Sequence, residues 1–374
     1  MASMAPPLPP QLVSYIAPGA PARRRPATGA EAFLRPEIGF TPNWYRTALG
    51  IDFGARWHTD PGYRCETVRA MRAELVHRFP GSGIGATDRP ERPLDLLTGV
   101  YGGSVVAGIY GVPLVYAPDN WPNCEKRYLT DDQADDLEPP DLDRTPLFVD
   151  LMRQVEWIAA CEGRVEGYVN WQGVLNTAHR LRGEALFTDV LEAPERARRL
   201  FGCVCATMIE AEQRLHSRQR ASGVAVDFTT VSNCLVNLIS PSQYARLLLP
   251  FDQQIAGGFG RIGVHNCAWR VDPYLEHYAR IPRVGYIDMG LTSDLRQVRA
   301  RFPVARRAVM ITPVEFVENS REALRAQLER IAAECGPCDV VVADLEAGTP
   351  DAKVRWFLGC CEAVGRATGT VQAR

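Results

Sequence analysis

The stretch GRIGVHNCAW, residues 260–269, contains a short apolar run that ends at His265, with Cys267 two residues later. The run 262–264 is typical of a strand. Two residues that flank one position at a strand end can turn toward one point, and a neutral imidazole and a thiolate both suit Zn²⁺. A buried histidine beside an inert core thiol would give the same pattern, so the surrounding sequence has to decide between the two interpretations.

From about residue 150 to the end, strand-like apolar runs alternate with stretches of helical periodicity. This alternation predicts a parallel sheet with right-handed crossovers. The expected strands are 165–170, 224–229, 262–265, 284–289, 308–311 and 340–344, and the expected helices are 194–215, 241–257, 271–279, 292–301, 320–335 and 350–367. With more β structure before them, these units fit a closed (β/α)8 TIM barrel better than an open sheet.

The chain before residue 150 is less regular. Residues 1–38 are rich in Pro and Ala, include a basic run at 23–25, and are predicted to form an N-terminal arm outside the barrel. Residues 39–374 are predicted to form one barrel domain, in which 39–149 is an irregular part that includes a cap. The segment GSGIGA, residues 81–86, lies between no clear strand and helix and is interpreted as a loop, not a dinucleotide site.

Composition excludes several classes of protein. The chain has 374 residues, of which 46% are hydrophobic and 23% charged, and this is a globular profile. A net charge of −2 favours neither a nucleic-acid backbone nor an anionic membrane as partner. There is no apolar run long enough to span a membrane and no signal-peptide pattern, and the eleven cysteines are scattered as in a reduced cytosol. We therefore expect a cytoplasmic protein.

Polar residues follow most of the expected strands. Active sites of (β/α)8 barrels lie at the carboxyl ends of the strands. The residues there are Asn170 with Gln172, Asp227, His265 with Cys267, Asp288, and Asp344 with Glu346. Loops are polar in general, which explains the amides, but it explains a His-x-Cys pair among carboxylates less well. The CGPC stretch, residues 335–338, precedes the last strand and is expected at the opposite rim.

Three further segments carry a resemblance to a known family. They are ALFTDVLEAPERARRLF (185–201), VDFTTVSNCLVNLISPSQYARLLLPFDQQI (226–255) and IGVHNCAWRVDPYLEHY (262–278). The order of these segments along the chain resembles that of the uroporphyrinogen decarboxylase superfamily. The His-x-Cys pair resembles most closely the branch of that superfamily that contains the methylcobalamin:coenzyme M methyltransferases. The resemblance implies a TIM barrel that carries out zinc-dependent methyl transfer. It also implies a corrinoid as methyl donor or acceptor, and because this chain has no Asp-x-His-x-x-Gly motif, the corrinoid would be free or held by another protein.

The chain departs from the family pattern in two places. The arginine-rich motif that holds porphyrin carboxylates is absent from residues 40–64, so porphyrinogen decarboxylation is not expected. The third zinc ligand of the methyltransferase branch is a cysteine after the last strand, where this chain reads ADLEAGTPD. Glu346 or Asp344 is therefore expected to complete the metal site with His265 and Cys267, and Asp288 to act as a further ligand or as a partner of one.

The expected function is zinc-dependent methyl transfer to or from a small molecule. When bound, zinc lowers the pKa of a substrate thiol. Asp227 and Asp288 are the expected catalytic carboxylates. The residues expected to contact substrate or cover the barrel mouth are Asn170, Gln172, Trp57, His58 and Tyr63, although the last three would serve equally to pack a cap.

Three alternatives remain open at this point. One is a lyase or another group transfer at the same metal. The second is a metal-free enzyme in which His265 is the acid/base and Cys267 the nucleophile. The third is a non-catalytic barrel that binds a corrinoid protein or another partner. The sequence does not determine whether the chain forms a homodimer.

Overall fold

The computed structural model describes residues 32–82, 84 and 94–372, with side chains to residue 369. Its centre is a six-stranded sheet in the order β1-β8-β7-β6-β5-β4, and every pairing is parallel. The strands are β1 (Leu34–Phe40), β4 (Phe228–Ser232), β5 (Arg261–His265), β6 (Val284–Gly290), β7 (Arg306–Met310) and β8 (Cys338–Leu345). The protein is thus an α/β protein in which the first strand pairs with the last.

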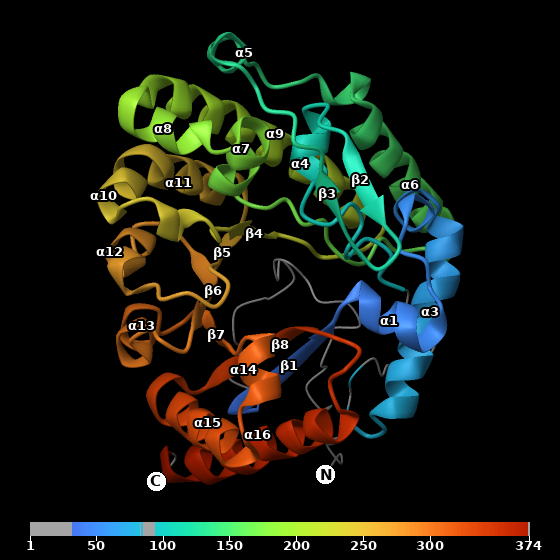
Figure 1. The fold of residues 1–374 in the computed structure, drawn as a ribbon, viewed down its shortest axis with the longest axis vertical. Coiled ribbons are helices and arrows are strands. Elements are labelled where there is room, and N and C mark those ends of the chain that lie inside the picture. The colour runs from blue at the N-terminus through green and yellow to red at the C-terminus, as the bar shows by residue number, and fades with distance from the viewer. Residues whose placement is uncertain (1–31, 83, 85–93, 373–374) are drawn as a thin grey trace, which may run out of the picture.

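Helices connect the parallel strands, because a parallel pair requires a crossover, and one more helix follows the last strand. In Figure 1 most of these helices follow one another along the outer side of the sheet. They are α10 (Pro241–Gln243), the π-helical turn η3 (Tyr244–Leu248), α11 (Leu249–Gly258), α12 (Leu275–Tyr278), α13 (Leu295–Arg301), α14 (Pro313–Glu318), α15 (Arg321–Cys335) and α16 (Asp351–Gln372). Side chains of Ser240, Asp294, Thr312 and Ser320 cap four of the starts by accepting backbone N–H groups.

The first half of the chain is mostly helical and carries one small antiparallel hairpin. Its helices are α1 (Pro42–Leu49), α2 (Ala55–Thr59), α3 (Pro61–Arg78), α4 (Val105–Ile109), α5 (Asp131–Asp135), α6 (Pro146–Glu162), α7 (Val174–Arg182), α8 (Ala185–Glu192) and α9 (Pro194–Ala221). The hairpin joins β2 (Leu114–Ala117) to β3 (Asn120–Cys124), and short turns are η1 (Leu142–Arg144), η2 (Val236–Leu238) and η4 (Asp272–Tyr274). Among the described helices, none combines the length and the hydrophobicity that a membrane crossing would require.

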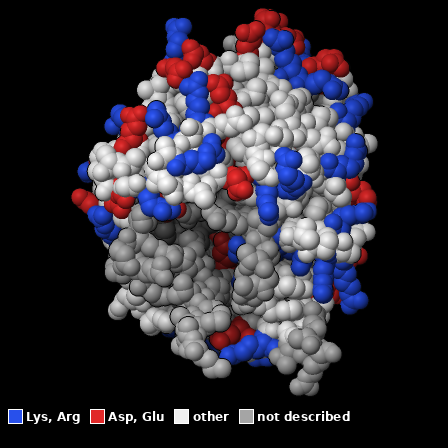
Figure 2. Space-filling view, turned by 180° about the vertical axis from the view of Figure 1, so that it is seen from behind, with Lys and Arg blue, Asp and Glu red and all other residues white. Residues whose placement is uncertain are grey.

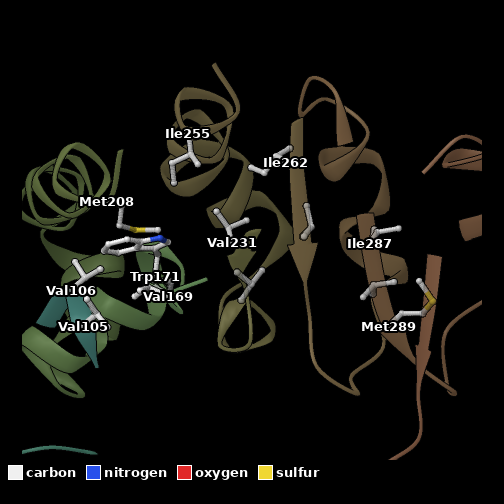
Figure 3. Packing of buried hydrophobic residues seen from close by; sticks show 14 of the residues in the cluster. Val105, Val106, Val169, Trp171, Met208, Val231, Ile255, Ile262, Ile287 and Met289 are labelled. Atoms are coloured by element: carbon white, nitrogen blue, oxygen red, sulfur yellow. The ribbon is translucent and has the colours of Figure 1, made fainter. Parts of the chain in front are cut away.

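Both faces of the central sheet are buried, as is usual for parallel sheets. Successive residues of β6 show this: Ile287 belongs to the main core between sheet and helices, whereas Tyr286 belongs to a second cluster on the other face. Figure 3 shows Val231, Ile262 and Ile287 from three strands in the main core, with Ile255 of α11 nearby. Because side chains alternate along a strand, His265 and Asp288 share the face of Tyr286.

The surface carries charges of both signs. Figure 2 shows Lys and Arg side chains interspersed with Asp and Glu over the described part of one face. This mixture agrees with the net charge of −2.

The structure corrects two strand predictions. The expected strands 262–265, 284–289, 308–311 and 340–344 correspond to β5–β8, but the expected strand 224–229 begins four residues later, as β4. Residues 165–170 form no strand, only an isolated bridge between Glu166 and Asp95. Gly167 has φ +104°, and a Cβ there would lie 1.9 Å from the Asp95 carboxylate, so the backbone leaves extended geometry at this point.

The N-terminal arm was predicted to extend to residue 38, but β1 already begins at Leu34. Residues 34–38 were assigned to it, yet they lie in β1 and pair in register with β8. Leu34 and Ile38 are buried, and Arg35 forms a buried ion pair with Asp339, 2.5 Å apart. Proline in the segment concealed the strand, because Pro36 removes a backbone donor and reads as a strand breaker. Residues 1–31, and half of the loop predicted at 81–86 (residues 83, 85 and 86), lie outside the described residues.

Candidate metal centre

Two neighbouring strands end at the same edge of the sheet and bring three metal-ligating side chains together. Ser232 of β4 pairs with His265 of β5, so Cys234 and Cys267 each follow by two residues. The ligand atoms of Cys234, His265 and Cys267 all lie within 4.8 Å of one another. The Cys267 Sγ is 2.9 Å from the Cys234 Sγ and 3.2 Å from the His265 Nε2. All three side chains therefore point to one position.

A buried carboxylate fixes the orientation of His265. Asp288 is 0% exposed, and its Oδ2 lies 2.5 Å from the His265 Nδ1. The Tyr286 hydroxyl donates to the same oxygen at 2.8 Å, and the Asn266 backbone N–H donates to the other at 2.6 Å. With Nδ1 engaged, Nε2 is left facing the sulfur atoms. A histidine backed by a carboxylate is the usual arrangement behind a metal-binding imidazole.

Left-handed backbone geometry brings Cys267 back toward His265. Cys267 has φ +57°, a value that non-glycine residues adopt rarely and often at functional sites. The intervening Asn266 is fully buried, and its amide donates to the Asp288 carbonyl at 2.8 Å while accepting from the Tyr278 hydroxyl at 2.8 Å. Asn266 is thus anchored away from the cluster, which leaves its two neighbours on a common side.

Cys234, His265 and Cys267 shift one another's pKa values when no metal is bound. Burial lowers the pKa of His265, but the carboxylate of Asp288 and the sulfur of Cys234 outweigh it and raise the pKa to about 10. A hydrogen bond from Cys267 lowers the pKa of Cys234 well below the usual range, and the same bond raises the pKa of Cys267. In the metal-free cluster these shifts favour the thiolate form of Cys234 and the protonated form of His265, with Cys267 as the hydrogen-bond donor.

The donor set and its spacing suit a zinc ion. All eleven cysteines are free, and 2.9 Å is well beyond the disulfide bond length of about 2.05 Å. Tetrahedral zinc with Zn–S near 2.3 Å implies sulfur atoms about 3.8 Å apart. The two sulfurs would have to move apart by less than about 1 Å, which small side-chain rotations can supply. Two sulfur ligands and one imidazole leave a fourth position open.

The carboxylates at the end of the last strand and just beyond it lie outside this group of three. Asp344, at φ +57°, keeps a solvent-accessible side chain; the surrounding protein raises its pKa, and the charge of His265 opposes this. Glu346 is exposed and accepts a hydrogen bond from the Asn43 amide at 3.0 Å. In the described structure the third ligand atom close to His265 and Cys267 is a sulfur, not a carboxylate oxygen.

Other residues singled out in the sequence are placed elsewhere. Asp227 precedes β4 and its carbonyl accepts from the Arg261 N–H, so it lies at the edge of the sheet opposite the cluster. The Asn170 carbonyl oxygen of the side chain accepts from the Gln172 backbone at 3.0 Å, and the Gln172 side chain accepts from Asn176 at 2.9 Å. Both side-chain amides thus hydrogen-bond within residues 170–176, the segment that leads into α7.

The aromatic residues of the expected cap are mostly packed inside it. Trp57 and His58 are 0% exposed. The Trp57 indole donates to Thr67 at 3.1 Å, and the His58 Nδ1 accepts from the Tyr101 backbone at 3.0 Å. Burial lowers the pKa of His58 to about 3, so this side chain is neutral. The Tyr63 hydroxyl contacts the Asp52 backbone.

Sequence reasoning missed Cys234 because it ended the preceding strand too early. With β4 ending at Ser232, the residues that follow read Asn233-Cys234, which matches the Asn266-Cys267 that follows His265. The same dipeptide, Asn-Cys, directly follows two successive strands, and this repetition could have indicated that both cysteines belong to one site. Its meaning depended on the strand boundary, which is the least certain part of any prediction from sequence.

Oxidation of the metal-free protein should link the two sulfurs. We expect mild treatment with hydrogen peroxide to form a Cys234–Cys267 disulfide, because these sulfurs are already in contact and no bound ion separates them. Peptide mapping by mass spectrometry without reductant would detect it, and bound zinc should suppress it. Cross-linking of either cysteine mainly to a third residue would contradict the geometry described.

Comparisons with known proteins bear on the fold. No family model and no curated protein sequence matches this chain. Among solved structures, a methyltransferase from Methanosarcina mazei is similar, with a TM-score of 0.61 and 13% sequence identity. The match covers 89% of this chain and 94% of that one. At this identity the likeness shows that the two chains share a fold over nearly their whole lengths.

Proposed function

We propose that this protein is a zinc-dependent methyl-transfer enzyme whose metal is held by Cys234, His265 and Cys267. The convergence of these three ligand atoms, with Asp288 behind the imidazole, is the observation that carries the proposal. Three protein ligands with one open position are typical of catalytic rather than structural zinc. The likeness to a methyltransferase and the sequence resemblance described above favour methyl transfer among the reactions such a site supports.

We further propose that the sheet closes into a (β/α)8 barrel. Two contacts favour closure between β4 and β1. The Ser232 backbone N–H donates to the Gln172 carbonyl at 3.0 Å, which ties residues 165–172 to β4. The parallel bridge between Glu166 and Asp95 then ties that segment to the chain near residue 95. In such a barrel the metal cluster lies at the carboxyl rim, where barrel active sites form.

The residues of the chain would each have a definite task. When bound, zinc would lower the pKa of a substrate thiol so that a thiolate is present at neutral pH. Asp288 holds His265 in the tautomer that presents Nε2. Cys234 and Cys267 supply two negative charges that balance the charge of the ion, and a sulfur-rich site favours sulfur substrates. Asp344, whose side chain is solvent-accessible and whose charge interacts with that of His265, would contact the substrate.

The experiment that tests the proposal combines metal analysis with a methyl-transfer assay. We expect about one zinc per chain in the purified protein and zinc-dependent demethylation of methylcobalamin by a small thiol, followed by its absorbance change. Cys267→Ser should lose both. Full activity in protein shown to be free of metal would contradict the proposal.

A second candidate function is metal-free covalent catalysis. The observation that favours it is the contact of an imidazole with a pair of thiols, since an adjacent imidazole can activate a thiol as a nucleophile. In this case Cys234 is the nucleophile and Cys267 its hydrogen-bond donor. The two functions differ in one measurement: a chelator abolishes zinc-dependent transfer and leaves covalent catalysis unaffected.

Porphyrinogen decarboxylation is not part of the proposal. Arg64, within the region where the decarboxylases carry their carboxylate-binding arginines, is 0% exposed. Its guanidinium donates to the Leu96 and Trp57 carbonyls, both at 2.7 Å, and to the Gln154 side chain at 2.6 Å. These bonds engage it in the core, where a substrate carboxylate does not reach it.

A further inference from the structure

We propose that Asn176 is a positioning residue that sets the Cys234 sulfur on the metal, an inference that rests on the proposed zinc site. Asn176 lies on α7 and is 6% exposed. Its Oδ1 accepts the backbone N–H of Leu235, the residue directly after Cys234, at 3.1 Å. One amide thus fixes the backbone next to this ligand.

Close packing brings the start of α7 to the end of β4. Gly173 is the N-cap of α7, and a Cβ at this position would lie 2.3 Å from the Ser232 carbonyl oxygen. Only glycine permits this approach. The Ser232 N–H in turn donates to the Gln172 carbonyl. The segment 172–176 is therefore held against the last residue of β4 on one side and against the Cys234 loop on the other.

A second amide fixes the orientation of Asn176. The Asn176 Nδ2 donates to the Gln172 Oε1 at 2.9 Å, which leaves Oδ1 as the acceptor that Leu235 requires. Gln172 itself has φ +61°, and its side chain fits because Gly103 lacks a Cβ, which would lie 2.2 Å from the Gln172 Nε2. Gln172 and Asn176 thus form a hydrogen-bonded chain that ends at the backbone next to Cys234.

Cys234 lies two residues beyond the end of β4 and is anchored from both sides. On one side Asn233 donates its backbone N–H to the His265 carbonyl at 2.6 Å and its side-chain amide to Asp252 at 3.1 Å, and on the other side Asn176 holds Leu235. Without Asn176, the Leu235 N–H loses its partner, and the backbone that directs the Cys234 sulfur toward His265 and Cys267 is no longer fixed on this side. Loss of such an outer contact weakens metal binding typically by roughly 10–100-fold.

A double-mutant cycle tests the inference. Zinc affinity would be measured by competition with a chromogenic chelator for the wild type, Asn176→Ala, Cys234→Ala and the double variant. We expect Asn176→Ala to weaken binding by roughly 10–100-fold and to have no further effect when Cys234 is already Ala. Equal losses in both backgrounds would mean a general structural role and would overturn the inference.

A spectroscopic measurement and a control variant distinguish an effect on the Cys234 sulfur from a general loss of structure. With Co²⁺ in place of zinc, Asn176→Ala should reduce the sulfur-to-cobalt charge-transfer absorbance. Asn43→Ala, which removes only the partner of Glu346, is the matched control and should leave both affinity and spectrum unchanged. Circular dichroism and melting temperature identify any variant that is misfolded.

The inference can fail separately from the proposed function. Wild-type protein that binds no zinc would contradict the proposed function alone. In that case alkylation of Cys234 by iodoacetamide, followed by mass spectrometry in metal-free protein, still tests Asn176. We expect Asn176→Ala to change the rate several-fold relative to Asn43→Ala, and an unchanged rate would overturn the positioning role.

Discussion

Replacing Cys234 by Ala is expected to lower the zinc affinity of the protein by at least about 100-fold, since it removes a direct ligand and such a loss exceeds that of an outer contact. The Cys234 sulfur lies 2.9 Å from the Cys267 sulfur, at the position where the three ligand atoms converge. Competition against a chromogenic chelator measures the affinity. Cys161→Ala, which removes an exposed cysteine of α6, is the matched control and should bind zinc like the wild type.

The same measurement separates the two ligand sets. In the set inferred from the structure, Asp344→Ala and Glu346→Ala keep zinc affinity close to that of the wild type. In the set expected from the sequence, one of them supplies the oxygen ligand, and its loss weakens binding as strongly as loss of a sulfur. A large loss in Glu346→Ala, with Cys234→Ala unaffected, would restore the carboxylate model.

Replacing Asp288 by Asn should weaken zinc binding by roughly 10–100-fold, because this carboxylate orients the His265 ring and raises its basicity. The substitution also leaves a hydrogen-bonding conflict. One Asp288 oxygen accepts from His265 and Tyr286, and the other accepts from the Asn266 backbone. An amide has only one oxygen, so at least one donor then faces the NH₂ group, at a cost of about 1–3 kcal/mol.

Zinc affinity and thermal unfolding together check this prediction. Asp344→Asn removes the same charge nearby without touching the imidazole, and it should leave the melting temperature and zinc affinity nearly unchanged. Zinc affinity of Asp288→Asn within twofold of the wild type would show that the carboxylate does not support the metal.

The pH dependence of metal-free protein provides a second readout for Asp288. Burial alone would lower the pKa of His265, and Asp288 together with Cys234 reverses this and raises the pKa to about 10, with Asp288 the larger of the two contributions. A raised histidine pKa contributes stability that is complete below the unfolded-state pKa and is lost as the pH rises through the folded-state value. Between pH 7 and pH 10 the wild type should therefore lose more stability than Asp288→Asn.

Local sequence patterns were sufficient for the general fold and for part of the site. The alternation of apolar runs and helical periodicity in 262–344 predicted β5–β8, because both patterns are set by neighbours in the chain. His265, Cys267 and Asp288 follow from the same reasoning, since each stands at or just beyond the end of a strand with a clear apolar run. These strand ends meet at one edge wherever a parallel sheet forms.

Tertiary structure alone decided which third candidate ligand lies beside His265 and Cys267. Cys234 becomes adjacent to His265 because β4 runs to Ser232 and pairs there with β5, and register between strands is a property of two segments that no single segment encodes. Similarly, residues 34–38 look like a proline-rich arm until β8 supplies the partner strand. Local composition determines which segments can form strands, whereas the burial of both faces of the sheet determines where each strand begins, which strands pair and which cysteine reaches the site.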